Sequence, residues 1–129
     1  MIMPNLSAIE QALGQALAAV SGIGPIAWPN RSADPARPFV LFDHVPTQWD
    51  NIAVDVSETR AEGYFIAAIC IAQGGFTTNA NARATAIMAA FPAGRRLTGM
   101  AIINSRPLPG YFDGIGWRQP VRVDYRSEA

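Results

Sequence analysis

Apolar and polar residues alternate along the first twenty positions with the spacing of an amphipathic helix. Apolar side chains recur every three or four residues, at Leu6, Ile9, Leu13, Leu17 and Val20. Ser7 and Glu10 have the spacing of a capping box, in which each side chain binds a free amide at the start of a helix. The segment Ser21-Gly22-Ile23-Gly24-Pro25 ends the pattern, because glycine and proline disfavour helix continuation. The pattern therefore predicts a first helix with one apolar face.

Three extended segments follow. Ile26–Trp28 is short, and Phe39–Val45 shows the two-residue alternation of a strand. Thr59–Ala72 contains an unbroken apolar run, which is typical of a central strand covered on both faces. Between the last two segments, polar residues surround Trp49, so we expect a long hairpin loop at about 46–58.

The remainder of the chain predicts a second helix and two more strands. Thr77 or Thr78 caps a helix that runs to about Phe91. Gly99–Asn104 has the pattern of a short strand, and Val121–Arg126 alternates cleanly between apolar and charged residues. The order α-β-β-β-α-β-β predicts an α+β fold, a mainly antiparallel sheet of four to five strands with two helices packed on it.

Composition narrows the classes of function. The 129 residues suit a single domain over 1–129. The chain has no lysine, which excludes a P-loop lysine and a lysine Schiff base. Its single cysteine, Cys70, excludes an internal disulfide. We expect no membrane span, because the longest apolar run, Tyr64–Ala72, is far below the roughly 18 residues that cross a bilayer. We also expect no signal peptide, because no basic region precedes the alanine-rich start.

Charge is distributed unevenly although the net charge is zero. Residues 1–62 hold seven acidic residues against three arginines, and residues 63–129 hold seven arginines against three acidic residues. The zero net charge argues against a dedicated nucleic-acid-binding protein. Halves of opposite sign favour a surface that attracts copies of the same chain, unless folding mixes the two halves.

The candidate catalytic residues give no enzyme signature. Cys70 and His44 are the only possible thiol–imidazole pair, but Cys70 lies in an apolar strand, where cysteine behaves as a small hydrophobic residue. Asp43 and His44 are neighbours in a strand and therefore point to opposite faces. With one histidine and dispersed acidic residues, we expect no metal site, no cofactor and no catalytic residue. The alternative is a small α+β ligand-binding domain or enzyme with a pocket near His44 and Cys70.

Aromatic residues and arginines in loops remain as candidates for function. Trp49 lies in the polar loop, and nothing around it predicts a core segment. Trp28 and Trp117 fit positions at the edge of the core instead. Arg95 and Arg96 are consecutive in the turn after the second helix. Because tryptophan and arginine are enriched at the energetic centres of protein interfaces, Trp49 and the two arginines are candidate interface residues.

Three segments of the chain form a pattern known from one family. The first is the helix followed by Pro25-Ile26-Ala27-Trp28-Pro29-Asn30. The second is the glycine-rich turn into an alanine- and asparagine-rich helix that ends in Phe91-Pro92. The third is the closing segment Gly116-Trp117-Arg118-Gln119-Pro120-Val121-Arg122-Val123-Asp124-Tyr125-Arg126. With these segments the chain resembles the tail terminator-like proteins of long-tailed bacteriophages and related phage-like particles, and the resemblance covers nearly the whole chain.

The resemblance implies a structural virion protein, a small α+β subunit that forms a hexameric ring. The ring caps the tail tube, stops its polymerisation and joins the tail to the head connector at the tail–neck junction, while DNA passes without sequence-specific binding. The implied partners are further copies of the chain, the tail tube protein and the head–tail connector or head-closure protein, with assembly in the bacterial host cytoplasm. Within this interpretation, the expected interface residues are Trp49, Asp50, Ile52, Arg95, Arg96 and Arg118. The alternative in the virion is a head-closure or tail-completion neck protein.

Overall fold

The computed structural model describes residues 6–30, 35–51, 59–72, 74, 78–97 and 99–127. Within these ranges the chain forms two helices and seven strands. In chain order they are α1 (Leu6–Ala18), β1 (Ile26–Ala27), β2 (Phe39–Asn51), β3 (Thr59–Ala72), α2 (Thr78–Ala90), β4 (Arg96–Leu97), β5 (Met100–Pro107), β6 (Tyr111–Phe112) and β7 (Gly116–Ser127). Over the same ranges, neither helix is long and apolar enough to cross a membrane.

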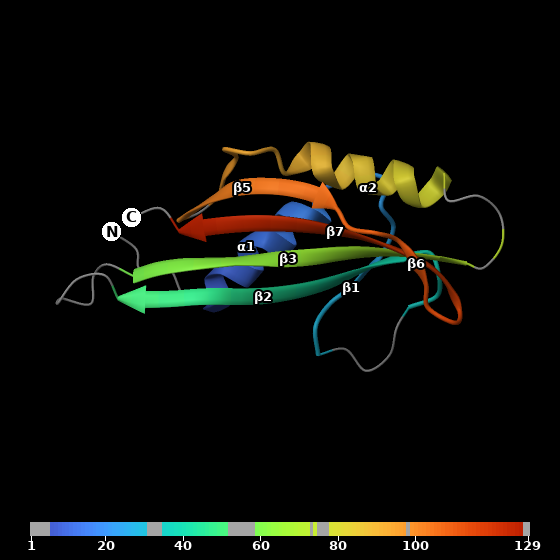
Figure 1. Ribbon diagram of the computed structural model, residues 1–129, viewed down its shortest axis with the longest axis horizontal. Coiled ribbons are helices and arrows are strands. Elements are labelled where there is room, and N and C mark those ends of the chain that lie inside the picture. Colours follow the sequence, from blue (N-terminus) through green and yellow to red (C-terminus); the bar gives the residue numbers. More distant parts are fainter. Residues whose placement is uncertain are drawn as a thin grey trace.

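The seven strands form one sheet in the order β1-β2-β3-β7-β5-β4, with β6 paired to β7. β1 is parallel to β2 and the other pairings are antiparallel, so the sheet is mixed. Figure 1 shows the long strands side by side in a curled sheet, a half-barrel with α1 behind it. The prediction of an α+β fold with four to five mainly antiparallel strands in the order α-β-β-β-α-β-β is therefore wrong, and the protein is mostly β.

The two strands missing from the predicted order are each two residues long. β4 pairs with the start of β5, and β6 pairs with the start of β7. A segment of two residues is too short to show the alternation of apolar and polar positions that marks a strand. β4 and β6 are therefore recognised only by their pairing with a long neighbouring strand. The parallel pairing of β1 with β2 also depends on contacts between distant parts of the chain.

β2 is longer than its alternation predicts, because it continues as far as Asn51. Its pairing with β3 shifts between Pro46 and Gln48, where proline has no amide hydrogen to donate. Beyond this irregularity the pairing resumes, and Asn51 lies opposite Thr59. Six residues expected in the hairpin loop thus belong to β2, and five of them pair with β3, while residues 52–58 lie outside the described residues.

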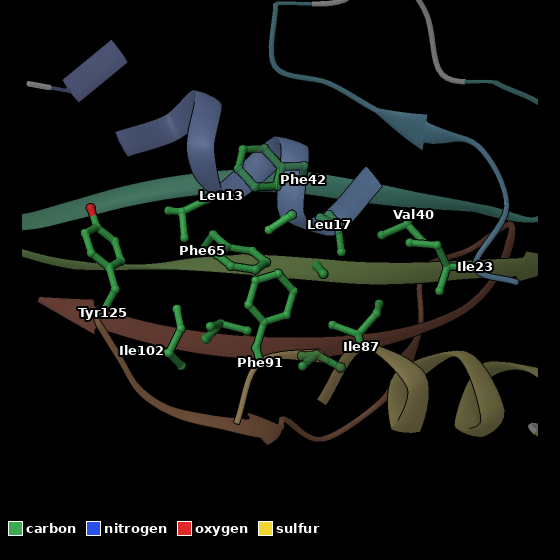
Figure 2. Packing of buried hydrophobic residues seen from close by; sticks show 14 of the residues in the cluster. Leu13, Leu17, Ile23, Val40, Phe42, Phe65, Ile87, Phe91, Ile102 and Tyr125 are labelled. Carbon is green, nitrogen blue, oxygen red and sulfur yellow. The ribbon is translucent and has the colours of Figure 1, made fainter. Parts of the chain in front are cut away.

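A single hydrophobic cluster joins both helices to one face of the sheet (Figure 2). Phe65 on the central strand β3 contacts Phe42 from β2 and Phe91, which follows α2, at ring-centroid distances of 5.3 and 5.2 Å. α1 contributes the buried Ile9, Leu13 and Leu17, so its predicted apolar face is confirmed at these positions, whereas Leu6 is 48% exposed. α2 lies close to the sheet because two of its three buried positions are alanine.

The other face of the sheet has a smaller buried cluster at one end. It consists of Ala27, Phe39, Leu41, Ala68 and Cys70. The predicted burial of β3 on both faces is therefore confirmed for its second half, where residues 67–71 are all buried. In its first half, Tyr64 and Ile66 are only half-buried, so this face is more open there.

Candidate assembly surfaces

The structure does not bring the only cysteine and the only histidine together. Cys70 is completely buried in the small cluster on the face away from the helices. His44 lies opposite Phe65 and shares its face of the sheet, the one that carries the helices. Because the two side chains point to opposite faces, they form no thiol–imidazole pair. The described part of the chain also contains no group of three or more potential metal ligands.

His44 instead forms a structural contact between α1, β2 and β7. Its side chain is 4% exposed, with Nε2 2.5 Å from the phenolic oxygen of Tyr125 and Nδ1 3.6 Å from Oε1 of Glu10. Burial lowers the pKa of His44, while the Glu10 carboxylate acts in the opposite direction. A neutral imidazole has one N–H group and a carboxylate only accepts, so we assign the hydrogen to Nδ1. Tyr125 then donates to Nε2, and burial, which raises the pKa of Tyr125 to about 12, keeps its hydroxyl protonated.

β6 and the turn that joins it to β7 expose three large apolar side chains within five residues. Tyr111, Phe112 and Ile115 are 46%, 54% and 69% exposed, and we call residues 111–115 the apolar hairpin. Clustered apolar side chains at a surface mark sites that contact other molecules. Sequence reasoning missed this surface, although two adjacent aromatic residues before an Asp-Gly turn were a signal for it.

Asp113 holds the apolar hairpin in place. Its Oδ1 accepts hydrogen bonds from the amides of Ile115 and Gly116, each at 2.9 Å. Its Oδ2 accepts from Nη2 of Arg37 at 2.5 Å and from Nε of Arg118 at 2.8 Å. The Arg37 guanidinium and the Gly116 amide hold the pKa of Asp113 well below its usual range. A charged carboxylate thus ties the hairpin to the segment that precedes β2.

Three arginines are predicted interface residues, and the structure shows how two of them, Arg95 and Arg118, are held within the chain. Arg95 donates from Nη1 to the last carbonyl of α2, and its guanidinium lies 5.3 Å from the ring centre of Phe91. Arg118 is half-buried in its ion pair with Asp113. Arg96 is exposed on β4. Arg95 and Arg118 therefore have intramolecular contacts as well as any role at an interface.

The other predicted interface residues lie at or beyond the far end of β2. Trp49 lies opposite Ala61 in the pairing of β2 with β3, and Asp50 follows it. Ile52 is outside the described residues. The apolar hairpin lies at the opposite end of the sheet, next to the end of β3 (Figure 1). The interface role of Trp49, Asp50 and Ile52 stays a prediction.

Another apolar surface lies between α1 and the end of β1. Trp28 is 42% exposed and contacts Phe42, with 5.6 Å between ring centroids. Trp28 therefore lies at the edge of the core, as predicted. Its indole covers Gly14, where a Cβ atom would lie 2.9 Å from the ring. These residues and polar side chains of α1 line an open groove of about 630 Å³.

These features are typical of a protein that acts through contacts with other proteins. In the described ranges, the chain has a buried thiol, a histidine used in packing, and apolar side chains exposed on a hydrogen-bonded turn of the sheet. Such surfaces serve contacts with other proteins.

The chain belongs to the phage tail terminator family, whose family model matches residues 7–125. The resemblance seen in the sequence is thereby confirmed, and the protein has a structural role in a phage tail. The family is one of structural virion proteins. No curated protein gives a significant match.

Solved structures share the fold at low sequence identity. One protein, whose name states no activity, aligns over 95% of this chain and 92% of its own, with 19% identity and a TM-score of 0.68. A chain from the virion of a native gene transfer agent particle aligns over 92% of both chains, with 17% identity and a TM-score of 0.56. Likeness at these identities shows the common fold alone.

Proposed function

We propose that copies of this chain close into a hexameric ring that caps the tail tube of a phage or a phage-like particle. The ring stops polymerisation of the tube and joins the tail to the head connector at the tail–neck junction. The particle is assembled in the bacterial host cytoplasm, and DNA passes through the ring. Membership of the tail terminator family supports this role, and the gene transfer agent virion with a similar fold is consistent with it.

The apolar hairpin is the observation that carries the proposal. Phe112 and Ile115 are exposed on a turn that Asp113 holds in one conformation. A pre-organised surface loses little conformational entropy on binding, which suits a permanent contact in a particle. The predicted interface residue Trp49 lies at the opposite end of the same sheet. Contact residues at both ends fit a subunit that stands between two partners, the tail tube and the head connector.

The net charge is compatible with passage of DNA. A strongly basic channel would retain DNA through its phosphates, whereas this chain has a formal net charge of zero. The proposal also assigns contacts to the residues predicted from the sequence. Trp49, Asp50 and Ile52 contact the neighbouring subunit or the tube. Arg95, Arg96 and Arg118 contact acidic partners or line the channel.

Native mass and tube capping test the proposal. Six copies of the 13.8-kDa chain have a mass of about 83 kDa, which light scattering measures. Negative-stain images of the same fraction are expected to show a ring with a central hole. When added to growing tail tubes, the protein is expected to bind one end and to fix the tube length. A chain that forms no ring, either alone or on tubes, contradicts the proposal.

Binding to tail tubes and to the isolated head connector distinguishes a terminator from another neck protein. A head-closure or tail-completion protein would bind the isolated head connector and leave tube growth unchanged. A terminator is expected to bind tube ends first and to recruit the connector afterwards. The order of binding in a two-component mixture therefore separates the two assignments.

A further inference from the structure

The sheet order keeps the oppositely charged halves of the chain apart. β1 and β2 come from the acidic half, residues 1–62, whereas β4, β5 and β7 come from the basic half, residues 63–129. The two sets lie on opposite sides of the central strand β3. Within the described sheet, folding therefore preserves the charge separation that the sequence contains. We call the sheet face away from the helices, where Asp43, Arg122 and Arg106 lie, the open face.

One row across the open face runs from an acidic edge to a basic edge. Asp43 on β2 lies opposite Ile66 on β3, and Ile66 lies opposite Arg122 on β7. Arg122 in turn lies opposite Arg106 on β5. Neighbouring strands are about 4.8 Å apart, so three spacings of about 14 Å in total separate Asp43 from Arg106. Both end residues are exposed, and neither forms an ion pair with another residue in the described chain.

Arg106 also faces a like charge. It lies directly opposite Arg122, and like charges in such cross-strand pairs destabilise a sheet. Arg122 is compensated, because its Nε donates to Asp124 at 2.9 Å and its guanidinium lies 3.8 Å from the ring centre of Tyr64. Arg106 has no corresponding partner among the described residues. A carboxylate from another molecule would offset this repulsion.

Asp43 and Arg106 stand on strand segments whose outer edges pair with no further strand in the described chain, and α2 lies beside β5 on the face that carries the helices (Figure 1). β1 pairs with β2 only at Val40 and Leu41, before Asp43 is reached. β4 and the residues before it cover β5 only as far as Ile102. Open edges pair readily with further strands. Within one copy, β2 and β5 run in opposite directions. When a second copy lies beside the first in the same orientation, its β2 is therefore antiparallel to β5 of the first copy.

We propose that copies of this chain associate edge to edge, with Arg106 on the β5 edge of one copy against Asp43 on the β2 edge of the next. The contact is heterologous, so each copy uses both edges and a series of copies closes into a ring when the rotation between them allows it. The inference rests on the proposed ring and names the surfaces through which its subunits meet.

Charge reversal tests the contact directly. Asp43→Arg and Arg106→Asp each place like charges against one another at every contact, whereas the double variant restores opposite charges. Arg126→Asp is the matched control for Arg106→Asp, because it makes the same change in net charge on the interior strand β7. Association is measured by light scattering over a dilution series in 50 and 300 mM salt, and circular dichroism checks that each variant is folded. We expect each single reversal to weaken association by about tenfold, and the double variant and the control to remain within about threefold of the original chain.

The outcomes separate this contact from the proposed function. If the original chain forms rings and caps tubes, but the single reversals leave association unchanged or the double variant rescues nothing, the edge contact is wrong and the terminator role stands. If the chain assembles only on tube ends, the same four variants are compared by tube capping, with the same expected order. If the original chain forms no ring under either condition, both the edge contact and the proposed ring are wrong.

Discussion

The side chains of His44 and Tyr125 meet across a strand that lies between them. His44 is on β2 and Tyr125 is on β7, yet Nε2 and the phenolic oxygen are 2.5 Å apart above the intervening β3. In Figure 2 the Tyr125 hydroxyl points from its strand towards β2. With Glu10 of α1 on the other ring nitrogen, this contact joins one helix and two strands at one end of the core.

Removing the Tyr125 hydroxyl tests this contact. In Tyr125→Phe, the buried Nε2 of His44 loses its donor, so we expect the free energy of unfolding to fall by about 1–3 kcal/mol. Tyr64→Phe is the control, because its ring remains available to the guanidinium of Arg122, and we expect a change within about 0.5 kcal/mol. Urea unfolding followed by circular dichroism measures both values. Equal losses in the two variants would contradict the structural role of the hydroxyl.

Gly63 provides the space through which Tyr125 reaches His44. A Cβ atom at this position would lie 2.6 Å from the Tyr125 oxygen and 2.7 Å from the carbonyl oxygen of Val45. The backbone atom cannot move without disturbing the pairing of β2 with β3, so we expect Gly63→Ala to cost about 1–3 kcal/mol. Gly14→Ala is the comparison, since there the Cβ atom meets only the indole of the half-exposed Trp28.

The two glycine variants are therefore expected to differ in the size of their effect on stability. In the middle of a helix, alanine is favoured over glycine by up to about 1 kcal/mol, which offsets the displacement of the indole in Gly14→Ala. Thermal unfolding is expected to show a lower Tm for Gly63→Ala than for the original chain. For Gly14→Ala, the Tm is expected to stay within about 4 °C of the original value. A Gly63→Ala variant as stable as the original chain would show that the strands separate easily at this point.

Stability is expected to depend on pH through His44, the chain's only histidine. Burial lowers its pKa in the folded protein below the ordinary value of 6.5, so the unfolded chain takes up the proton first as the pH falls. The free energy of unfolding is therefore expected to be lower at pH 5 than at pH 7, with a slope of at most about 1.4 kcal/mol per pH unit. Asp113 contributes little in this range, because its ordinary pKa of 3.8 and its lowered pKa in the folded protein both lie below pH 5. His44→Gln is expected to abolish the slope, and a retained slope in that variant would assign the effect to other groups.

The carboxylate of Asp113 is expected to control the order of the apolar hairpin. In Asp113→Ala the amides of Ile115 and Gly116 lose their acceptor, so their hydrogen exchange is expected to become about tenfold faster. The amide of Val123 in β7, far from the turn, serves as an internal control and is expected to exchange as before. Nuclear magnetic resonance resolves the individual amides. Unchanged exchange at the turn would mean that the backbone holds its conformation without the side chain.

Exposed apolar residues of the hairpin are expected to matter for capping and not for folding. Phe112→Ser removes a 54% exposed side chain from the hairpin, and Leu6→Ser removes a 48% exposed side chain from α1. We expect only Phe112→Ser to weaken binding to tube ends, by about tenfold or more, because buried aromatic anchors dominate binding energies. Both variants are expected to unfold within about 1 kcal/mol of the original. Equal capping by the two variants would remove the hairpin from the interface.

Local patterns were sufficient for β3 and α2. The fourteen residues of β3 have the predicted bounds, because the apolar run and its flanking turns are both local features. α2 is found at Thr78–Ala90, close to the predicted helix from Thr77 or Thr78 to about Phe91. The extent of β2 could not be predicted in the same way. Its polar residues up to Asn51 form a strand only because β3 lies beside them.

The candidate site was predicted less completely than the fold elements. Arginine and tryptophan side chains are recognisable as contact residues from their chemistry, but their partners are not. Arg118 is held by Asp113, five residues before it, whereas the second guanidinium on that carboxylate comes from Arg37, 76 residues away. The apolar hairpin was missed for the same reason, since only the bracing by distant residues shows that its apolar side chains are fixed at the surface.

By itself, the sequence determined where the two helices and β3 form, the separation of charge between the two halves of the chain and the resemblance to tail terminators. These properties depend on neighbouring residues or on simple counts, so they can be recognised without a fold. Tertiary structure alone decided that the last strand lies between β3 and β5, and that Asp43 and Arg106 stand at opposite edges of one row. It also decided that Cys70 and His44 face apart. Strand order and the choice of face arise from contacts between residues far apart in the chain, and no local pattern specifies them.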